Sequence, residues 1–265
     1  MLTQKFGGLR AILAFDNWPA LLLVRLFDRK AGFVAYRKKG LDILIDHRGG
    51  DENGIRQCIA SHMYSNYLPS FVLRQAVRVI DLGANGGGFP LMLKIAGIEI
   101  ARVVSVEMNP LTFLRLQLNL GTNLGDAAVA VNAAVCGSLP DTPILLKPSR
   151  GSTGQSMYDN GNGSTAPSVP VKATTLKALC DQYFGAELVD ICKIDIEGAE
   201  YELFQFTPDD VLCKIRHLIV EFHDPPRTPP AVARLAALGF TEITIEETRR
   251  TGDRTEVRVF RGPAA

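Results

Sequence analysis

The chain has 265 residues, of which 46% are hydrophobic and 22% are charged. This length allows a sizeable core and fits one main α/β domain with an N-terminal elaboration. The 29 Lys and Arg residues nearly cancel the 28 Asp and Glu residues, so the formal net charge of +1 gives no global field that would attract nucleic acid or an anionic membrane.

The cysteine content indicates reduced thiols. The five cysteines are odd in number, form no C-x-x-C pair and lie mostly in apolar runs. Such cysteines are typical of buried free thiols in a reducing compartment, and they predict a cytoplasmic protein.

Residues 1–77 are expected to form an N-terminal cap. Two apolar stretches, 9–15 and 20–27, are interrupted by Asp16 and Arg25, and both are too short for a membrane-spanning helix or a clean signal peptide. We expect no transmembrane segment and favour helices packed into the cap. Amphipathic helices that contact a membrane or a partner are the alternative.

The rest of the cap is predicted to contain a hairpin and a helix. Residues 33–48 alternate about a Lys-Lys-Gly turn, which is the pattern of a β-hairpin. Residues 55–74 have helical periodicity with a break near Pro69.

From residue 78 the pattern changes to short apolar strands separated by helical segments. This order predicts crossover connections and a mostly parallel sheet, in a domain that spans 78–265. The tail, 241–262, alternates around a Thr-Gly-Asp-Arg turn and predicts an antiparallel hairpin at one edge of the sheet. The expected strands are 78–82, 102–107, 128–135, 190–195 and 217–222, and the expected helices are 90–97, 110–123, 175–184, 200–206 and 230–239.

A long segment between the third and fourth strands carries no periodic pattern. Residues 148–170 are rich in Gly, Ser and Asn and cannot bury enough apolar surface to order themselves. A lid over a site and an idle surface loop both fit this composition.

The stretch RVIDLGANGGGFP, residues 78–90, combines a strand, a glycine-rich turn and a helix start. Gly83, Asn85 and Gly88 stand where a G-x-G-x-x-G dinucleotide motif has its glycines, so the fit is partial. The Asp81 carboxylate would repel the pyrophosphate of NAD. It would attract the ammonium and sulfonium of S-adenosylmethionine. We therefore expect a cationic donor, with its carboxylate bound by the N–H groups of the turn.

The ends of the next two strands carry candidate adenosine contacts. Glu107 stands 26 residues after Asp81, where nucleotide-binding folds place an acid on the ribose hydroxyls. Glu107 could bind the ribose of NAD or of S-adenosylmethionine. Alternatively, it is an acid at a strand end on the surface and binds no ligand. Asn132 and Ala133 end the third strand, where an adenine edge could be read.

A second group of acids follows the last two parallel strands. Asp195 ends the strand 190–195, and Glu197 and Glu200 follow it. Glu221 lies at the end of the strand 217–222, and His223 and Asp224 follow it. Because adjacent parallel strands end at one edge of the sheet, we expect these groups to face a common crevice. They could deprotonate an acceptor hydroxyl, position it, or hold Mg²⁺ at Asp195, Glu221 and Asp224 or His223, although no tight ligand spacing requires a metal. Glu197 and Glu200 could instead be first-turn acids that complement a helix dipole.

His223 is the preferred general base among the four histidines, because an unperturbed imidazole titrates near neutral pH. His62 is a second candidate if its helix folds over the site. His47 and His217 are expected to be structural.

A family resemblance rests on five segments in order: VIDLGANGGGF, VVSVEMNP, VNAAVCG, VDICKIDIEGAEYELF and LIVEFH. They resemble the FkbM-type S-adenosylmethionine-dependent methyltransferases over roughly residues 79–223, and GLDILIDHRGGDENGIRQCIASHMY upstream is similar to the hairpin and helix that precede this domain in the family. The resemblance implies a Rossmann-like class I methyltransferase sheet with S-adenosylmethionine as donor. It also implies O-methylation of a hydroxyl on a sugar, glycolipid or secondary metabolite, as in natural product biosynthesis.

The resemblance also implies roles for individual residues. The chain departs from the family in its third consecutive glycine and in HRGGDENG, where relatives often show a threonine-serine-aspartate turn. We expect donor contacts at Asp81, Gly83, Ala84, Asn85, Gly87, Glu107, Met108, Asn132, Ala133 and Asp195, and we expect Asp195, Glu200, Glu221 and His223 to surround the acceptor, with Glu197 part of the acidic signature.

As a methyltransferase of this kind, the protein is predicted to bind a small-molecule hydroxyl acceptor rather than nucleic acid. Two alternatives stay open at this point. One is an NAD-dependent oxidoreductase, which the G-x-N-x-x-G spacing favours and Asp81 opposes. The other is a non-catalytic adenosyl-binding module, in which the convergent acids would have no purpose.

Overall fold

The protein is described from a computed structural model. It describes residues 9, 11–27, 32–49, 52–61, 63–148, 167–245 and 255–265. The predicted turn 251–254 and residues 149–166 of the predicted loop 148–170 lie outside these residues, and the last two residues of that loop belong to a strand. No helix among the described residues is long and apolar enough to cross a membrane.

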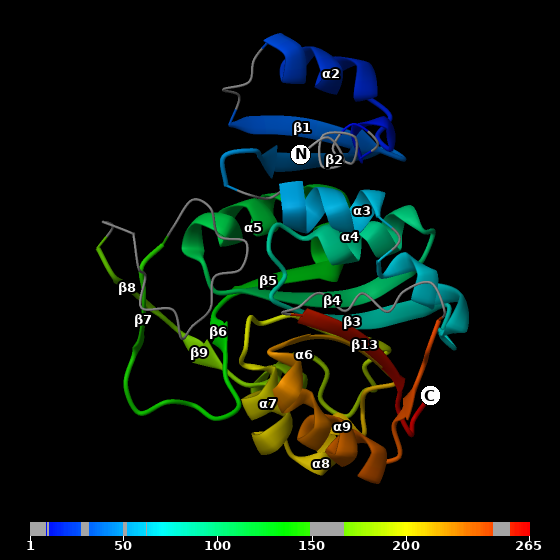
Figure 1. Cartoon of the computed structure of the whole chain (residues 1–265), viewed down its shortest axis with the longest axis vertical. Coiled ribbons are helices and arrows are strands. Elements are labelled where there is room, and N and C mark those ends of the chain that lie inside the picture. The colour runs from blue at the N-terminus through cyan, green and yellow to red at the C-terminus, as the bar shows by residue number, and fades with distance from the viewer. Residues whose placement is uncertain are drawn as a thin grey trace.

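A seven-stranded sheet forms the centre of the molecule (Figure 1), with the order β12-β13-β11-β10-β3-β4-β5. β11, β10, β3, β4 and β5 run parallel, while β13 pairs antiparallel with both β11 and β12. The predicted α/β class, the mostly parallel sheet and the antiparallel C-terminal edge are confirmed. The strands are β3 (Ala76–Leu82), β4 (Glu99–Glu107), β5 (Ala128–Asn132), β10 (Ile191–Ile194), β11 (His217–His223), β12 (Thr241–Glu242) and β13 (Thr255–Arg261).

Helices connect these strands and cover the sheet. α6, α7, α8 and α9 lie on one side of it, and α4 and α5 lie towards the N-terminal region (Figure 1). The helices are α4 (Gly88–Ile95), α5 (Pro110–Leu124), α6 (Leu176–Tyr183), α7 (Glu200–Phe206), α8 (Asp209–Leu212) and α9 (Thr228–Ala237).

The prediction of one strand over 128–135 is wrong, because these residues form two strands. β5 ends at Asn132, and β6 (Ala134–Val135) turns away to pair in parallel with β9 (Ala173–Thr174). The Asn132 side chain lies at the break. Its amide donates to the Glu107 carbonyl at 2.8 Å and to the Met108 carbonyl at 3.1 Å, and so binds the segment that follows β4. A further hairpin joins β7 (Ile144–Leu146) to β8 (Val169–Val171).

The N-terminal region consists of α2 (Trp18–Phe27) and the hairpin β1–β2 (Phe33–Lys38 and Leu41–Asp46), followed by short helical turns. The hairpin is where its alternation predicted it. The helical segment predicted over 55–74, with a break near Pro69, is shorter and more divided than expected. The chain forms a π-helical turn η1 (Glu52–Arg56), a four-residue α3 (Gln57–Ala60) and a 3-10 turn η2 (Ser65–Ser70). α3 stops where Ser61 adopts an extended backbone, and Pro69 lies inside η2.

Candidate active site

One face of the central sheet changes from apolar to charged along its strands. Alternate residues of neighbouring parallel strands share a face, because side chains repeat every two residues and the strands are in register. This face carries Val79 and Asp81 of β3 with Gly83 just after it, Val103, Ser105 and Glu107 of β4, Ile191 and Lys193 of β10 with Asp195 just after it, and Ile219, Glu221 and His223 of β11. The apolar members pack under the N-terminal turns, and the charged members gather at the carboxyl edge. The predicted convergence of the acids at one edge is therefore present.

The glycine-rich turn after β3 is shaped by the neighbouring strand. Gly83 has φ +72°, and a Cβ at this position would lie 1.7 Å from the carbonyl oxygen of Asp195. A side chain is excluded there by the backbone that follows β10 as much as by any ligand. Asn85 also has a left-handed backbone, with φ 49°.

The N–H groups of this turn are bonded within the chain, which differs from the expectation that they bind the carboxylate of a donor. Those of Gly83 and Ala84 donate to the Val106 carbonyl, at 3.0 and 2.9 Å. The Asn85 N–H donates to Glu107 Oε2 at 3.0 Å. The next two donate to the Asn85 side chain and the Ala84 carbonyl.

The third consecutive glycine, which departs from the family pattern, has a packing reason. A Cβ on Gly88 would lie 2.9 Å from Ile55 Cα, and one on Gly86 would lie 2.3 Å from Ile55 Cδ1. The glycine run thus lets the backbone of η1 and α3 lie directly on the turn. The N-terminal region is in this way part of the wall around the site.

Glu107 lies at the end of β4, where an acid for ribose hydroxyls was expected. Its Oε2 accepts from the Asn85 N–H, and its Oε1 accepts from the Asn109 N–H at 2.8 Å. Burial raises the pKa of Glu107 to about 7, although the two N–H donors oppose the shift. Both oxygens keep lone pairs for a further donor, and Glu107 is half-buried rather than enclosed.

Asp81 is fully buried beneath the turn, and it faces a lysine that the sequence reasoning missed. Neither carboxylate oxygen of Asp81 has a hydrogen-bond partner among the described residues. Lys193 Nζ lies 3.5 Å from Asp81 Oδ1 and 3.2 Å from Asp195 Oδ2, and it donates to the Gly83 carbonyl at 2.9 Å. Burial raises the pKa of Asp81, with Lys193 only partly opposing it. Burial alone would lower the pKa of Lys193, but the carboxylates of Asp195 and Asp81 outweigh it and hold that pKa above its usual value.

Lys193 carried a signal in the sequence. It is the one charged residue in the four-residue strand ICKI, all of whose members are buried. A charged residue in such a strand needs a partner, and in-register pairing places it beside Asp81.

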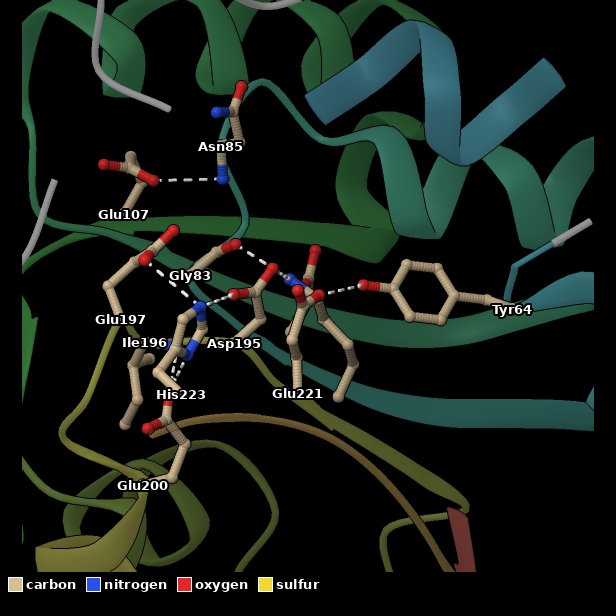
Figure 2. Close-up of polar contacts among 12 residues, drawn as sticks. Tyr64, Gly83, Asn85, Glu107, Asp195, Ile196, Glu197, Glu200, Glu221 and His223 are labelled. Carbon is tan, nitrogen blue, oxygen red and sulfur yellow. Dashed lines mark hydrogen bonds and ion pairs between the residues drawn. The ribbon is translucent and has the colours of Figure 1, made fainter. Parts of the chain in front are cut away.

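His223 lies at the centre of three acids. Figure 2 shows its ring between Glu197, Asp195 and Glu200. Nδ1 lies 3.0 Å from Glu200 Oε1, and Nε2 lies 3.1 Å from Glu197 Oε2 and 3.8 Å from Asp195 Oδ1. Burial alone would lower the pKa of His223, but the hydrogen bonds to Glu197 and Glu200 outweigh it and raise the pKa to about 11. At neutral pH this imidazole is a cation that holds the acids together, a role different from that of the expected general base.

Glu200 and Glu197 have distinct positions around that cation. Glu200 is fully buried, and its carboxylate accepts from the N–H groups of Ile196, at 3.0 Å, and Gly198, at 3.0 and 3.2 Å. It therefore shapes the segment after β10 rather than only complementing the α7 dipole. Glu197 sits in that segment with φ 54°, a strained backbone that its contact with His223 helps to hold.

Glu221 is contacted by a residue of the N-terminal region. The Tyr64 hydroxyl, which belongs to the turn before η2, donates to Glu221 Oε2 at 3.4 Å (Figure 2). The Tyr64 ring is buried and packs edge-on against Phe89, with 5.6 Å between ring centroids. Burial raises the pKa of Glu221 to about 6, and the nearby Asp195 charge adds to the shift. Tyr64 escaped sequence reasoning because it lies 157 residues from its partner.

The predicted magnesium set does not form a cluster. Among the described residues, the group whose ligand atoms lie within 4.8 Å of one another consists of Asp195, Glu197 and His223. Glu221 and Asp224 are not in it. This group includes an imidazole nitrogen, whereas Mg²⁺ prefers oxygen ligands, so the donor set does not fit Mg²⁺ well.

The other three histidines are His62, His217 and His47. His62 lies outside the described residues. His217 is fully buried at the opposite end of β11, where its ring bonds the Asp190 carbonyl and the Val72 N–H. His47 bonds the Tyr36 hydroxyl at 3.0 Å. Both have the structural role expected of them.

Comparison with known proteins assigns the domain. Residues 81–241, more than half of the chain, match the family model described as the methyltransferase FkbM domain. The methyltransferase sdnD of Sordaria araneosa is 26% identical over 186 residues, which cover 59% of this chain and 70% of that protein.

Two of the solved structures with similar chains are named as methyltransferases. A human methyltransferase 10 domain containing protein is 16% identical, with a TM-score of 0.43, and the match covers 96% of this chain and 94% of that one. Precorrin-6y C5,15-methyltransferase from Geobacter metallireducens GS-15 is 11% identical, with a TM-score of 0.43, covering 75% of this chain and 86% of that one.

Proposed function

This chain belongs to the FkbM methyltransferase family, and on that premise we propose that it methylates a hydroxyl group of a sugar, glycolipid or secondary metabolite. As a member of this family it is an S-adenosylmethionine-dependent methyltransferase. The oxygen target, a small-molecule acceptor rather than nucleic acid, and a cytoplasmic setting with all five cysteines unpaired are parts of the proposal.

The observation that supports the donor in this proposal is the excess of acid at the carboxyl edge. Among the residues that the structure describes at this edge, the two cations Lys193 and His223 lie beside five carboxyl groups, not counting Glu107. The five are those of Asp81, Asp195, Glu197, Glu200 and Glu221. Such a site favours a ligand that carries positive charge and disfavours the pyrophosphate of NAD.

The residues present fit the donor. Among the described residues, the buried Asp81 carboxylate has the Lys193 ammonium 3.5 Å away but no hydrogen-bond partner, so a donor ammonium, directly or through a water molecule, would satisfy it. Glu107 has lone pairs free for ribose hydroxyls. Gly83, Ala84, Asn85 and Gly87 would shape the surface beside it, with Met108, Asn132, Ala133 and Asp195 at the neighbouring strand ends. When bound, S-adenosylmethionine supplies the electrophilic methyl group on its sulfonium.

Glu221 is our candidate for the group that takes the proton of the acceptor hydroxyl. Its pKa of about 6 leaves it ionised at neutral pH and makes it a stronger base than an ordinary glutamate. Tyr64 orients the carboxylate through Oε2. His223, as a cation, and the buried Glu200 position Asp195 and the segment after β10.

Calorimetric titration tests the donor part of this proposal. We expect the purified protein to bind S-adenosylmethionine and S-adenosylhomocysteine but not NAD, and Asp81→Asn to weaken both adenosyl ligands. A panel of sugar, glycolipid and polyketide alcohols, with matched amines, then tests the acceptor. Methylation of amines alone contradicts the oxygen target, and donor binding without turnover on any acceptor favours the non-catalytic module.

A further inference from the structure

α2 is apolar around most of its circumference, and most of that apolar surface is uncovered. Its sequence is WPALLLVRLF, and Leu21 is its one buried residue. Leu23, Leu26 and Phe27 are 58%, 62% and 82% exposed. A helix that is hydrophobic on all sides normally lies in a protein core or in contact with lipid.

Four of the exposed residues of α2 form one continuous face. At 100° per residue, Pro19, Leu23, Leu26 and Phe27 fall within a single arc, opposite the buried Leu21. We call these four residues the outer face of α2. Figure 1 shows α2 as the outermost layer of the N-terminal end, beyond the hairpin β1–β2 and away from the central sheet. The outer face is therefore presented to the surroundings and not to the catalytic domain.

The segment that carries this face is strongly basic. Residues 1–40 contain eight Lys and Arg residues against two Asp residues, a net charge of +6, while residues 41–265 contain 21 against 26, a net charge of −5. The near-neutral total hides this division. α2 itself contains Arg25, which is exposed, and no acid.

We propose that the outer face of α2 binds the surface of a lipid bilayer that contains anionic lipid. An exposed apolar helix face in a basic segment has both components of interfacial binding, because the apolar side chains enter the headgroup boundary while the cations attract acidic lipids. A second copy of this chain is a poorer occupant, since two segments of charge +6 would repel each other. The inference does not depend on the identity of the methyl acceptor.

Vesicle flotation of the full chain tests this surface. We expect the protein to float with vesicles of phosphatidylcholine and phosphatidylglycerol, to bind phosphatidylcholine vesicles more weakly, and to be released by high salt. Trp18 is the single tryptophan of the chain and lies on α2, 42% exposed. Its fluorescence should shift to shorter wavelength when the mixed vesicles are added.

A matched pair of substitutions locates the contact. Leu26→Glu changes the outer face, whereas Leu114→Glu changes an equally exposed leucine on α5, 61% against 62%. We expect Leu26→Glu to reduce vesicle partitioning by about tenfold or more and Leu114→Glu to leave it unchanged. Both side chains are exposed, and circular dichroism melting checks that both variants fold.

Three results would overturn the proposal. One is the absence of flotation with mixed vesicles, and another is an equal loss of flotation in the two variants. The third is sedimentation showing a dimer that Leu26→Glu dissociates, which would assign the outer face to a second copy.

Discussion

Replacing Lys193 with methionine tests the charge arrangement under the glycine turn. Methionine has nearly the same length and stays apolar, so the packing of β10 changes little. The substitution removes the ammonium that contacts the Gly83 carbonyl at 2.9 Å, Asp195 at 3.2 Å and Asp81 at 3.5 Å. Asp195 is partly exposed and can turn to water, whereas Asp81 is fully buried.

The expected cost follows from the isolation of Asp81. Its oxygens have no other partner among the described residues, so the variant leaves a buried carboxylate uncompensated. Breaking a buried ion pair in this way costs roughly 3–5 kcal/mol in the free energy of unfolding. For a domain of this size that corresponds to a fall in Tm of about 10 °C. The penalty should shrink as the pH is lowered, because the raised pKa of Asp81 lets it become neutral by protonation.

A double-mutant cycle in urea, followed by circular dichroism, measures the effect. Asp81→Asn combined with Lys193→Met should be clearly more stable than Lys193→Met alone, because the asparagine removes the unpaired charge. A loss below about 1 kcal/mol in the single variant, or a double variant that is no more stable than it, would refute the reasoning.

Three further predictions concern the strand ends. We expect wild-type activity to fall below about pH 6, and Glu221→Gln should lower kcat/KM by about 10²–10⁴-fold and remove that pH dependence; a pH–rate profile that is the same in both would remove Glu221 as the base. His223 has its pKa raised from 6.5 to about 11, so its contribution to stability is complete below pH 6.5 and is lost as the pH rises through 11. The stability advantage of the wild type over His223→Gln, measured in urea, should therefore shrink steadily at alkaline pH, and a constant difference contradicts the protonated state. Gly83→Ala, whose Cβ would lie 1.7 Å from the Asp195 carbonyl oxygen, should cost roughly 4 kcal/mol or more in unfolding experiments. Gly97→Ala has φ +84° but an open surrounding, so about 1–2 kcal/mol is expected, and equal losses at the two glycines would contradict the role of the close approach.

The fold class and the acids at the strand ends could be predicted from the sequence, because they depend on local periodicity. An apolar strand that ends near an acid, such as the one leading to Asp81 or Glu107, can be recognised from its own residues without knowledge of the rest of the fold. Since parallel strands share their carboxyl edge, the meeting of the β10 and β11 acids followed from topology alone.

Features that depend on distant partners came only from the tertiary structure. The helix predicted over 55–74 divides into short turns that pack on the glycine run, and Ile55 explains the third glycine. Tyr64 reaches Glu221 across 157 residues. Neither relation leaves a repeating pattern in the sequence.

Protonation was likewise decided by the folded environment. The residue type suggests a His223 that titrates near neutrality, but three acids around its ring make it a cation. Lys193 looks like a misplaced charge in an apolar strand until register places it between Asp81 and Asp195. The sequence determined which charges exist at the carboxyl edge, and the tertiary structure decided their partners, because electrostatic energies depend on distances and burial that no single segment contains.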